Sequence, residues 1–348
     1  MQSNQKVETI YDINKDSKEI RSHEYVIGDI HGCYDEFNEL TTRILKSDSK
    51  AQFILVGDII DRGPKTWEML NWAMENVNRP GSRYKMIMGN HEYIKLEYID
   101  YYLSLRKENI ISNISEMQSD DYDFRDVLSD HNASDEKIQE IYNFIKTLPV
   151  YYETNSMLIR ADGTRKKQHY IVVHGDLDRN FMNKDESFRK TCLSMQEKRR
   201  YTIKGARTPK FRIVWDRNFF GHCELKHTII IHGHTPTISR DLRVRGAMSG
   251  MIDYKFNDIN VDCGMVFLNE HHRTANLAAI SLDDLEEIYL YKYPDSHYSC
   301  RFKREDTFYR DVMTGKEKIK KQRNTKQDRE ESDRLMDEAL KKLGLTDN

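Results

Sequence analysis

The strongest constraint on the fold is a pattern that recurs five times, in which a short aliphatic run stops at glycine beside aspartate, asparagine or histidine. The breaks are YVIGDIHG (25–32), FILVGDIIDRG (53–63), MIMGNHE (86–92), YIVVHGDL (170–177) and TIIIHGHTP (228–236). Apolar runs of about four residues bounded by glycine are typical of strands buried on both faces. Each break therefore predicts a buried strand that ends in a polar loop.

The segments between the first three breaks have the apolar spacing of helices. Residues 34–45 and 66–77 both carry aliphatic or aromatic side chains three or four positions apart. This βαβαβ order predicts an α/β sheet whose polar loops gather at the carboxyl ends of the strands. The later segment ANLAAISLDDLEEIYLY (275–291) predicts two short strands around an Asp-Asp turn that close the sheet.

Three regions differ in character. We expect a leader at 1–23, a catalytic domain at 24–295 and a charged, helical tail at 296–348. Within the catalytic domain, residues 93–168 break the strand pattern with a helical and acidic stretch, which we interpret as an insertion that forms a solvated cap beside the site, or else a surface that docks a partner.

Composition excludes several classes of protein. With 38% hydrophobic residues and apolar runs far shorter than the roughly 20 residues of a membrane helix, we expect no membrane span. The first residues lack a secretory pattern, so we expect a cytoplasmic location with reduced cysteines. A net charge near −2 predicts no stable nucleic-acid complex. The basic stretch 198–212 remains either a solvated loop or a patch that steers phosphate.

Six nitrogen or oxygen donors lie at the strand ends. Each alone is more often a turn residue or a satisfied core histidine, but six of them at successive strand ends make a coincidence improbable. No thiolate is among them, which favours Mn²⁺, Fe²⁺ or Zn²⁺ over soft metals. The donors are Asp29, His31, Asp58, Asn90, His174 and His234.

Together the five blocks resemble the signature of the calcineurin-like metallophosphoesterases. More narrowly, GDIHG, GDIIDRG, GNHE, HGD and HGHTP resemble the bacterial and phage branch of the phosphoprotein phosphatases, over about residues 24–290. This resemblance implies a four-layer α-β-β-α sandwich, with the insertion mostly helical.

The resemblance also implies a site with two divalent ions, Mn²⁺ foremost and Fe or Zn as alternatives. Asp58 would bridge them and the other five donors would divide between them, Asp29 and His31 on one ion and Asn90, His174 and His234 on the other. Two such ions activate a water that lies between them.

Four further residues match the family's catalytic positions. His91 resembles the general acid that protonates the leaving oxygen, and Asp61 the carboxylate that orients it. Arg62 matches an arginine that holds phosphate. Arg217, in a Trp-x-Arg match, is either a second phosphate clamp or a surface partner of a carboxylate.

Other polar residues near the blocks receive no catalytic role. We assign no metal to His232, and we interpret Asp176 as a turn residue. Asp262 is expected to support the site rather than to react. Cys263 has no partner in the sequence that would activate it as a nucleophile.

Three functions follow as hypotheses. The first is a serine/threonine protein phosphatase that hydrolyses phosphomonoesters of a phosphorylated protein or a small molecule. The second is a nucleotide enzyme, either a diadenosine tetraphosphate hydrolase or a nucleic-acid-end phosphatase; those hydrolases typically carry Gln where this chain has His31. The third is a phosphate-binding module without catalysis, which we would expect to lack a ligand or the acid, whereas every matched position is intact.

Overall fold

A computed structural model describes residues 14, 19–117, 128–175, 212–215, 217, 227–244, 246–269 and 274–291. Asp176, the basic stretch up to residue 211 and the predicted tail at 296–348 lie outside the described residues. The three-region division of the chain stays a prediction.

The first sheet contains the predicted βαβαβ unit. Its strands β2 (Glu24–Ile27), β3 (Gln52–Leu55) and β4 (Tyr84–Met86) are parallel, and α1 (Tyr34–Ser47) and α2 (Thr66–Asn76) connect them. Strands β10 (Ala278–Ser281) and β11 (Glu287–Tyr289) add to its other edge in antiparallel fashion, giving the order β11-β10-β2-β3-β4. The strand pair predicted to close the sheet is therefore confirmed.

The second sheet carries the last two polar breaks. Its order is β1-β5-β6-β7-β9-β8, and β6, β7 and β9 run parallel. The strands are β1 (Ile20–Arg21), β5 (Tyr151–Ile159), β6 (Arg165–Val173), β7 (Thr228–His232), β8 (Asp253–Lys255) and β9 (Asp258–Asn260). The ends of β6 and β7 place His174 and His234 at the same edge.

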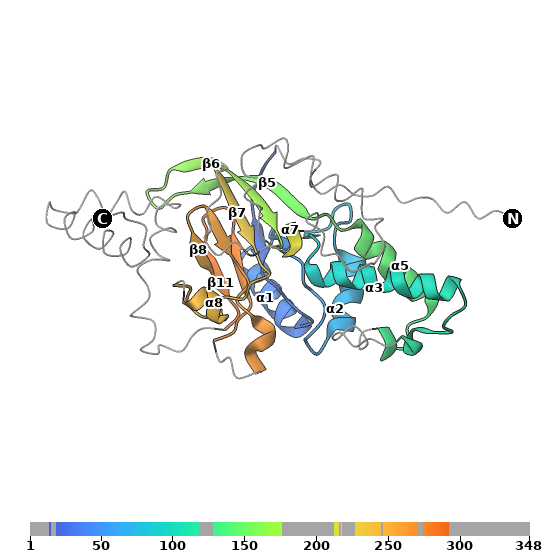
Figure 1. Cartoon of the computed structure of the whole chain (residues 1–348). Coiled ribbons are helices and arrows are strands. Elements are labelled where there is room, and N and C mark those ends of the chain that lie inside the picture. The colour runs from blue at the N-terminus through green and yellow to red at the C-terminus, as the bar shows by residue number, and fades with distance from the viewer. Residues whose placement is uncertain are drawn as a thin grey trace.

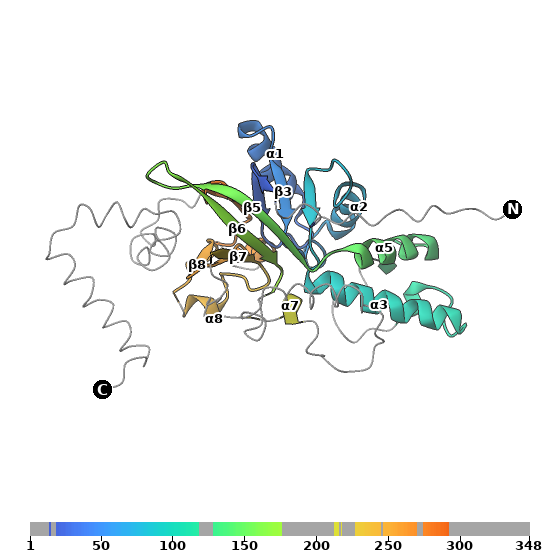
Figure 2. The same cartoon turned by 90° about the horizontal axis from the view of Figure 1, so that it is seen from above.

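Alternating side chains divide the core into two clusters. Val26, Ile54 and Val172 join the cluster between the two sheets, whereas their neighbours Ile27 and Leu55 join the cluster that includes α1 and α2. Figure 2 shows the resulting layers, with α1 and α2 outside the first sheet and the short helices α7 (Arg212–Trp215) and α8 (Arg240–Arg243) outside the second. The fold is the α/β sandwich expected for a metallophosphoesterase.

The insertion is helical only in its first part. Helices α3 (Asn90–Lys107) and α5 (Asp135–Thr147), with the 3-10 turn η1 (Ile114–Glu116), form an arm beside the sheets (Figure 1). Arg106 on α3 donates to Asp135 on α5 at 3.1 Å and binds the two helices together. From Tyr151 onward the segment forms the hairpin β5–β6 of the second sheet. A further 3-10 turn, η4, spans Met265–Asn269.

Within the described residues, no helix combines the length and the apolar character that a membrane crossing requires.

Candidate metal centre

The polar loops approach one another closely because glycines stand at their crossing points. A Cβ atom on Gly89 would lie 2.2 Å from Asp58 Oδ1, and one on Gly233 would lie 2.0 Å from Asp29 Oδ1. No side chain fits at either distance. These two glycines therefore allow the carboxylates of Asp58 and Asp29 to approach the neighbouring loops.

Asp58 lies between two groups of histidines. Its Oδ2 atom is 3.2 Å from His174 Nε2 and 3.6 Å from His31 Nε2. The described residues form two sets of three donors, and within each set the ligand atoms lie within 4.8 Å of one another. The sets are His31–Asp58–His91 and Asp58–His174–His234, so Asp58 belongs to both. One carboxylate shared by two donor sets is the arrangement that a bridging ligand needs.

The second set closes around the amide oxygen of Asn90. Asn90 Oδ1 lies 2.9 Å from His174 Nε2 and 2.7 Å from His234 Nδ1. His174 Nδ1 lies 2.8 Å from the carbonyl oxygen of Val56, which fixes the proton on Nδ1 and leaves the Nε2 lone pair facing the cluster. Three donors from three loops thus point at one position.

His31 is held in the same manner. Its Nδ1 atom donates to the carbonyl oxygen of Ile60 at 2.9 Å, so Nε2 presents a lone pair. Burial, together with the charges of His91 and Arg62, lowers the pKa of His31 to about 3, against the opposing effect of Asp58. The imidazole is therefore neutral, which is the form that binds a metal.

Asp29 lies beside these groups and not within either. Its carboxylate accepts the backbone N–H of His234 at 3.0 Å and is buried. Burial and the carboxylates of Asp262 and Asp58 raise the pKa of Asp29. In the first set the structure groups His31 and Asp58 with His91, whereas the family resemblance implied that His31 and Asp29 share one ion.

His91 and Asp61 form a buried dyad. His91 Nδ1 lies 2.8 Å from Asp61 Oδ2, and the backbone N–H of His91 donates to Asp58 Oδ1 at 2.9 Å. Burial lowers the pKa of His91, but Asp58 and Asp61 outweigh it and the net pKa is raised. The His91 ring stands edge-on to His31, with centroids 4.7 Å apart. His91 therefore belongs both to this dyad and to the first donor set.

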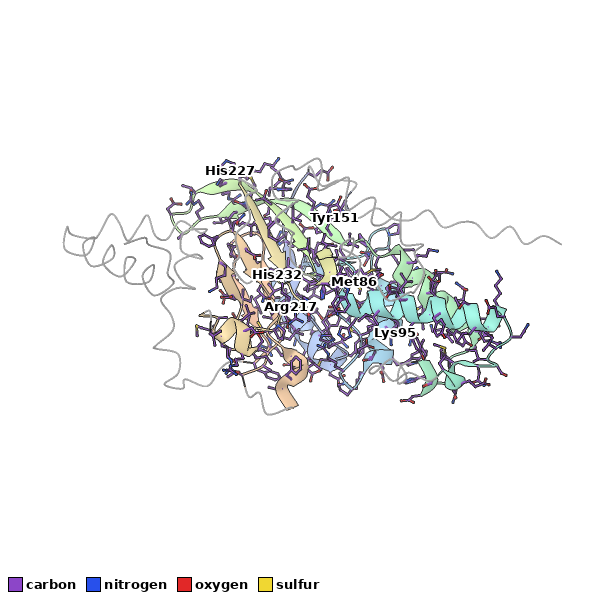
Figure 3. The ribbon with its side chains drawn as sticks, viewed as in Figure 1. Met86, Lys95, Tyr151, Arg217, His227 and His232 are labelled. Atoms are coloured by element: carbon purple, nitrogen blue, oxygen red, sulfur yellow. The ribbon has the colours of Figure 1, made fainter. Side chains whose placement is uncertain are left out.

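Two arginines face the histidines from the sides of the site. Arg62 donates to His31 Nε2 at 3.0 Å, and Arg217 Nε donates to His234 Nε2 at 3.2 Å. His234 Nε2 also lies 3.2 Å from the carbonyl oxygen of Trp215, which accepts a hydrogen bond from the Nε2–H group of the other tautomer. Both guanidinium groups thus lie within reach of an anion bound over the donor sets. Figure 3 labels Arg217 at the centre of the molecule.

Five of the six predicted donors lie together at this site, and the sixth, Asp29, lies beside them. Their chemistry suits divalent ions. Oxygen and neutral imidazole nitrogen are the ligands that Mn²⁺, Fe²⁺ and Zn²⁺ accept. The buried carboxylates of Asp29, Asp58 and Asp262 crowd one region. Burial, and after it the neighbouring carboxylates, raises the pKa of Asp29 and that of Asp262, the latter to about 6. A divalent cation would relieve the repulsion between these carboxylates, so the residues fit the metals that the family pattern implies.

His232 lies apart from the donor sets, whereas Asp262 is one of the buried carboxylates beside Asp29 and Asp58. His232 Nδ1 is 3.0 Å from the carbonyl oxygen of Gly233, and its Nε2 is 3.4 Å from Asp258, away from both donor sets. Asp262 accepts the backbone N–H of Gly264 at 2.9 Å.

Sequence reasoning missed two buried charged residues of α3. Glu92 is fully buried and accepts the backbone N–H groups of Gly89, Asp58 and Ile59 at 2.8 to 2.9 Å. Lys95 is also fully buried, with Nζ 3.2 Å from Asp61 Oδ1. Glu92 belongs to the GNHE block, and this motif could have drawn attention to it. Lys95 belongs to no motif that would have marked it.

A family model described as calcineurin-like phosphoesterase matches residues 25–262, well over half of the chain. The chain belongs to this family. Among curated relatives, the symmetrical bis(5'-nucleosyl)-tetraphosphatase of Hamiltonella defensa is 24% identical over 240 residues, which are 68% of this chain and 69% of that protein. The enzyme of the same name from Vibrio parahaemolyticus is 38% identical over 84 residues, but the match spans only 24% of this chain and 30% of the relative.

Two solved phosphatase structures are similar to this chain at low sequence identity. The cold-active protein-tyrosine phosphatase of a Shewanella species is 17% identical, with a TM-score of 0.45 over 79% of this chain and 84% of that one. A serine/threonine phosphatase from Saccharomyces cerevisiae is 14% identical, with a TM-score of 0.40 over 78% of this chain and 81% of that one.

Proposed function

We propose that this calcineurin-like phosphoesterase hydrolyses P–O bonds at the centre formed by Asp58, the histidines and the two arginines. The observation that carries the proposal is the shared position of Asp58. Its carboxylate lies close enough to His31 and to His174 to share a metal ion with each of them. Asp29, His31 and Asp58 would hold one divalent ion, and Asp58, Asn90, His174 and His234 the other. When bound, such a pair lowers the pKa of water and neutralises phosphate charge.

The chain's own side chains supply the remaining chemistry. Arg62 and Arg217 turn from the imidazoles to the phosphate oxygens and hold the phosphorus in line with the attacking water. The water oxygen bonds to phosphorus and releases a proton to solvent. As the opposite P–O bond breaks, His91 Nε2 gives its proton to the leaving oxygen, and Asp61 keeps the imidazole in the orientation that this transfer needs.

For the substrate we propose a dinucleoside tetraphosphate cleaved at its central bridge. The curated relatives carry that activity in their names, and the match with the Hamiltonella defensa protein spans 68% of this chain. Cleavage at the centre of diadenosine tetraphosphate with one water yields two molecules of ADP. We expect this reaction with Mn²⁺ as the added metal.

A phosphoprotein is the second candidate, and His31 favours it. The nucleotide enzymes typically carry glutamine at this place, whereas here an imidazole donates to Ile60 and turns Nε2 toward Asp58. A serine/threonine phosphopeptide is the corresponding substrate.

Parallel assays separate the two substrates. Purified protein receives Mn²⁺ with diadenosine tetraphosphate, a phosphoserine peptide or a phosphotyrosine peptide, and chromatography with phosphate release identifies the products. Faster formation of ADP than of free phosphate from either peptide supports the dinucleotide proposal, whereas preference for the phosphoserine peptide overturns it in favour of the second candidate. Asp58→Asn serves as the inactive blank, and Asp284→Asn, at an exposed turn, controls for loss of a carboxylate.

A further inference from the structure

Lys95 is a fully buried lysine one helical turn beyond His91 in α3. Residues four apart on a helix face the same side, so both side chains reach the same neighbour. That neighbour is Asp61, whose Oδ1 lies 3.2 Å from Lys95 Nζ and whose Oδ2 lies 2.8 Å from His91 Nδ1. Figure 3 shows Lys95 on the turns of α3 nearest the sheets. One helix therefore contacts both oxygens of a single carboxylate.

The loop that carries Asp61 requires such support. Asp61 and Arg62 have φ angles of 67° and 69°, in the left-handed region that non-glycine residues avoid. Such residues persist where surrounding contacts hold them, and they gather at functional sites. The Lys95 ammonium opposes rotation of the Asp61 carboxylate away from His91.

A purely structural ion pair is a weak explanation for a lysine at this position. Desolvating an ammonium is expensive, and an apolar side chain of similar volume would often serve the fold as well or better. The retained charge suggests a task in the site that the carboxylate serves.

We propose that Lys95 is a positioning residue for proton transfer by His91. Its ammonium fixes the Asp61 carboxylate, which fixes the His91 ring with Nε2 toward the leaving oxygen. This inference rests on the proposed function, in which His91 donates that proton.

Two substrates of similar size test it. Phenyl phosphate releases a basic phenolate that needs a proton, whereas p-nitrophenyl phosphate releases an anion that leaves without one. The ratio of the two rates on one sample measures proton transfer and does not depend on the folded fraction. His91→Asn sets the scale, with an expected loss of about 10² on phenyl phosphate, at the low end of what general acids contribute.

In Lys95→Met the rate of hydrolysis should fall about tenfold on phenyl phosphate and less than about twofold on p-nitrophenyl phosphate. The expected loss is smaller than that of His91→Asn because Lys95 only supports the proton transfer by His91. Lys95→Gln, which retains an N–H donor, recovers part of the loss. Adding Lys95→Met to His91→Asn lowers the ratio no further. Lys85→Met is the matched control, since Lys85 is another buried lysine, paired with Glu24 at 2.7 Å, and its loss leaves the ratio unchanged.

Equal rate losses on both esters in Lys95→Met, or none, overturn the inference. If His91→Asn remains selective in that case, the proposed function stands and Lys95 is structural. If His91→Asn also slows both esters equally, the role proposed for His91 is itself wrong.

Discussion

Glu92 Oε2 accepts the backbone N–H of Asp58 at 2.8 Å, so a buried side chain of α3 holds the backbone of the residue shared by both donor sets. Glu92 also accepts from Gly89 and Ile59 at 2.9 Å. Burial and the nearby Asp58 carboxylate raise the pKa of Glu92 to about 7. The start of α3 and the loop after β3 are therefore joined through one carboxyl group.

Removing that group should destabilise the fold. Glu92→Ala leaves three buried N–H groups without their acceptor, and each costs about 1–3 kcal/mol. Glu92→Gln retains one acceptor oxygen and should cost less. Urea unfolding measures both, with Glu75→Ala, an exposed glutamate of α2, as control. An alanine variant as stable as the wild type would contradict this role.

Arg62→Ala should separate phosphate binding from metal binding. Arg62 donates to His31 Nε2, and it is this histidine nitrogen that would bind the metal. Removing the arginine side chain therefore removes a phosphate contact but no metal ligand. We expect kcat to fall by about 10², as when one donor to a developing charge is deleted, while the metal content measured by mass spectrometry stays at the wild-type value. Loss of metal in parallel with activity would show that Arg62 supports the centre itself.

Divalent metal should stabilise the protein through Asp58. A ligand that binds only the folded state at 100 times its Kd adds about 2.7 kcal/mol. Added Mn²⁺ should therefore raise the melting temperature of the metal-free protein, and Asp58→Asn should reduce both this rise and the bound metal. Asp284→Asn should respond like the wild type. An undiminished rise in Asp58→Asn would remove Asp58 from the ligand set.

Much of the fold and of the candidate site was predictable, because the end of a strand in an α/β sheet marks both the strand itself and the polar residues of the site. An aliphatic run ending in glycine and aspartate marks the strand β3 and the donor Asp58 together. Lys95 was not predictable, and the GNHE motif marked Glu92 without indicating its burial, since a charged residue within a helical stretch usually faces solvent. Only the packing of α3 against the loop after β3 buries them.

The hairpin β5–β6 was predicted only from residue 170 onward, in the block YIVVHGDL, and the rest of it was hidden for a related reason. Its outer end, residues 159–167, is polar and mostly exposed, and it follows directly on the helical arm, so the whole stretch resembled an insertion. The parallel pairing of β6 with β7 in the second sheet is a long-range contact that the local pattern does not contain.

A buried ion pair between the sheets should matter for stability alone. Glu24 Oε1 accepts from Lys85 Nζ and from Tyr152 OH at 2.7 Å, and Oε2 accepts from Thr154 at 2.7 Å. Glu24→Ala leaves the lysine unpaired and should cost about 3–5 kcal/mol. Lys85→Met should cost less, because both hydroxyl donors to Glu24 remain. Equal unfolding midpoints for Glu24→Ala and wild type would refute this account.

Asp48 should make part of the stability depend on pH. Burial raises its pKa, but hydrogen bonds from His23, the Lys50 backbone and Tyr25 outweigh this and hold the pKa below its ordinary 3.8. A depressed folded-state pKa means that the ionised carboxylate favours the fold. Its contribution is therefore present above about pH 4, the ordinary range of Asp, and is lost as the pH falls through the lower folded value.

Asp48→Asn measures this contribution, because asparagine does not titrate. Asp48 Oδ2 lies 2.7 Å from the half-exposed His23, so we expect a difference of up to about 1 kcal/mol at pH 6, the range of exposed ion pairs. The urea midpoints of wild type and variant should converge as the pH is lowered toward 3. A gap that stays constant over this range would show that the hydrogen bonds of Asp48 do not depend on its charge.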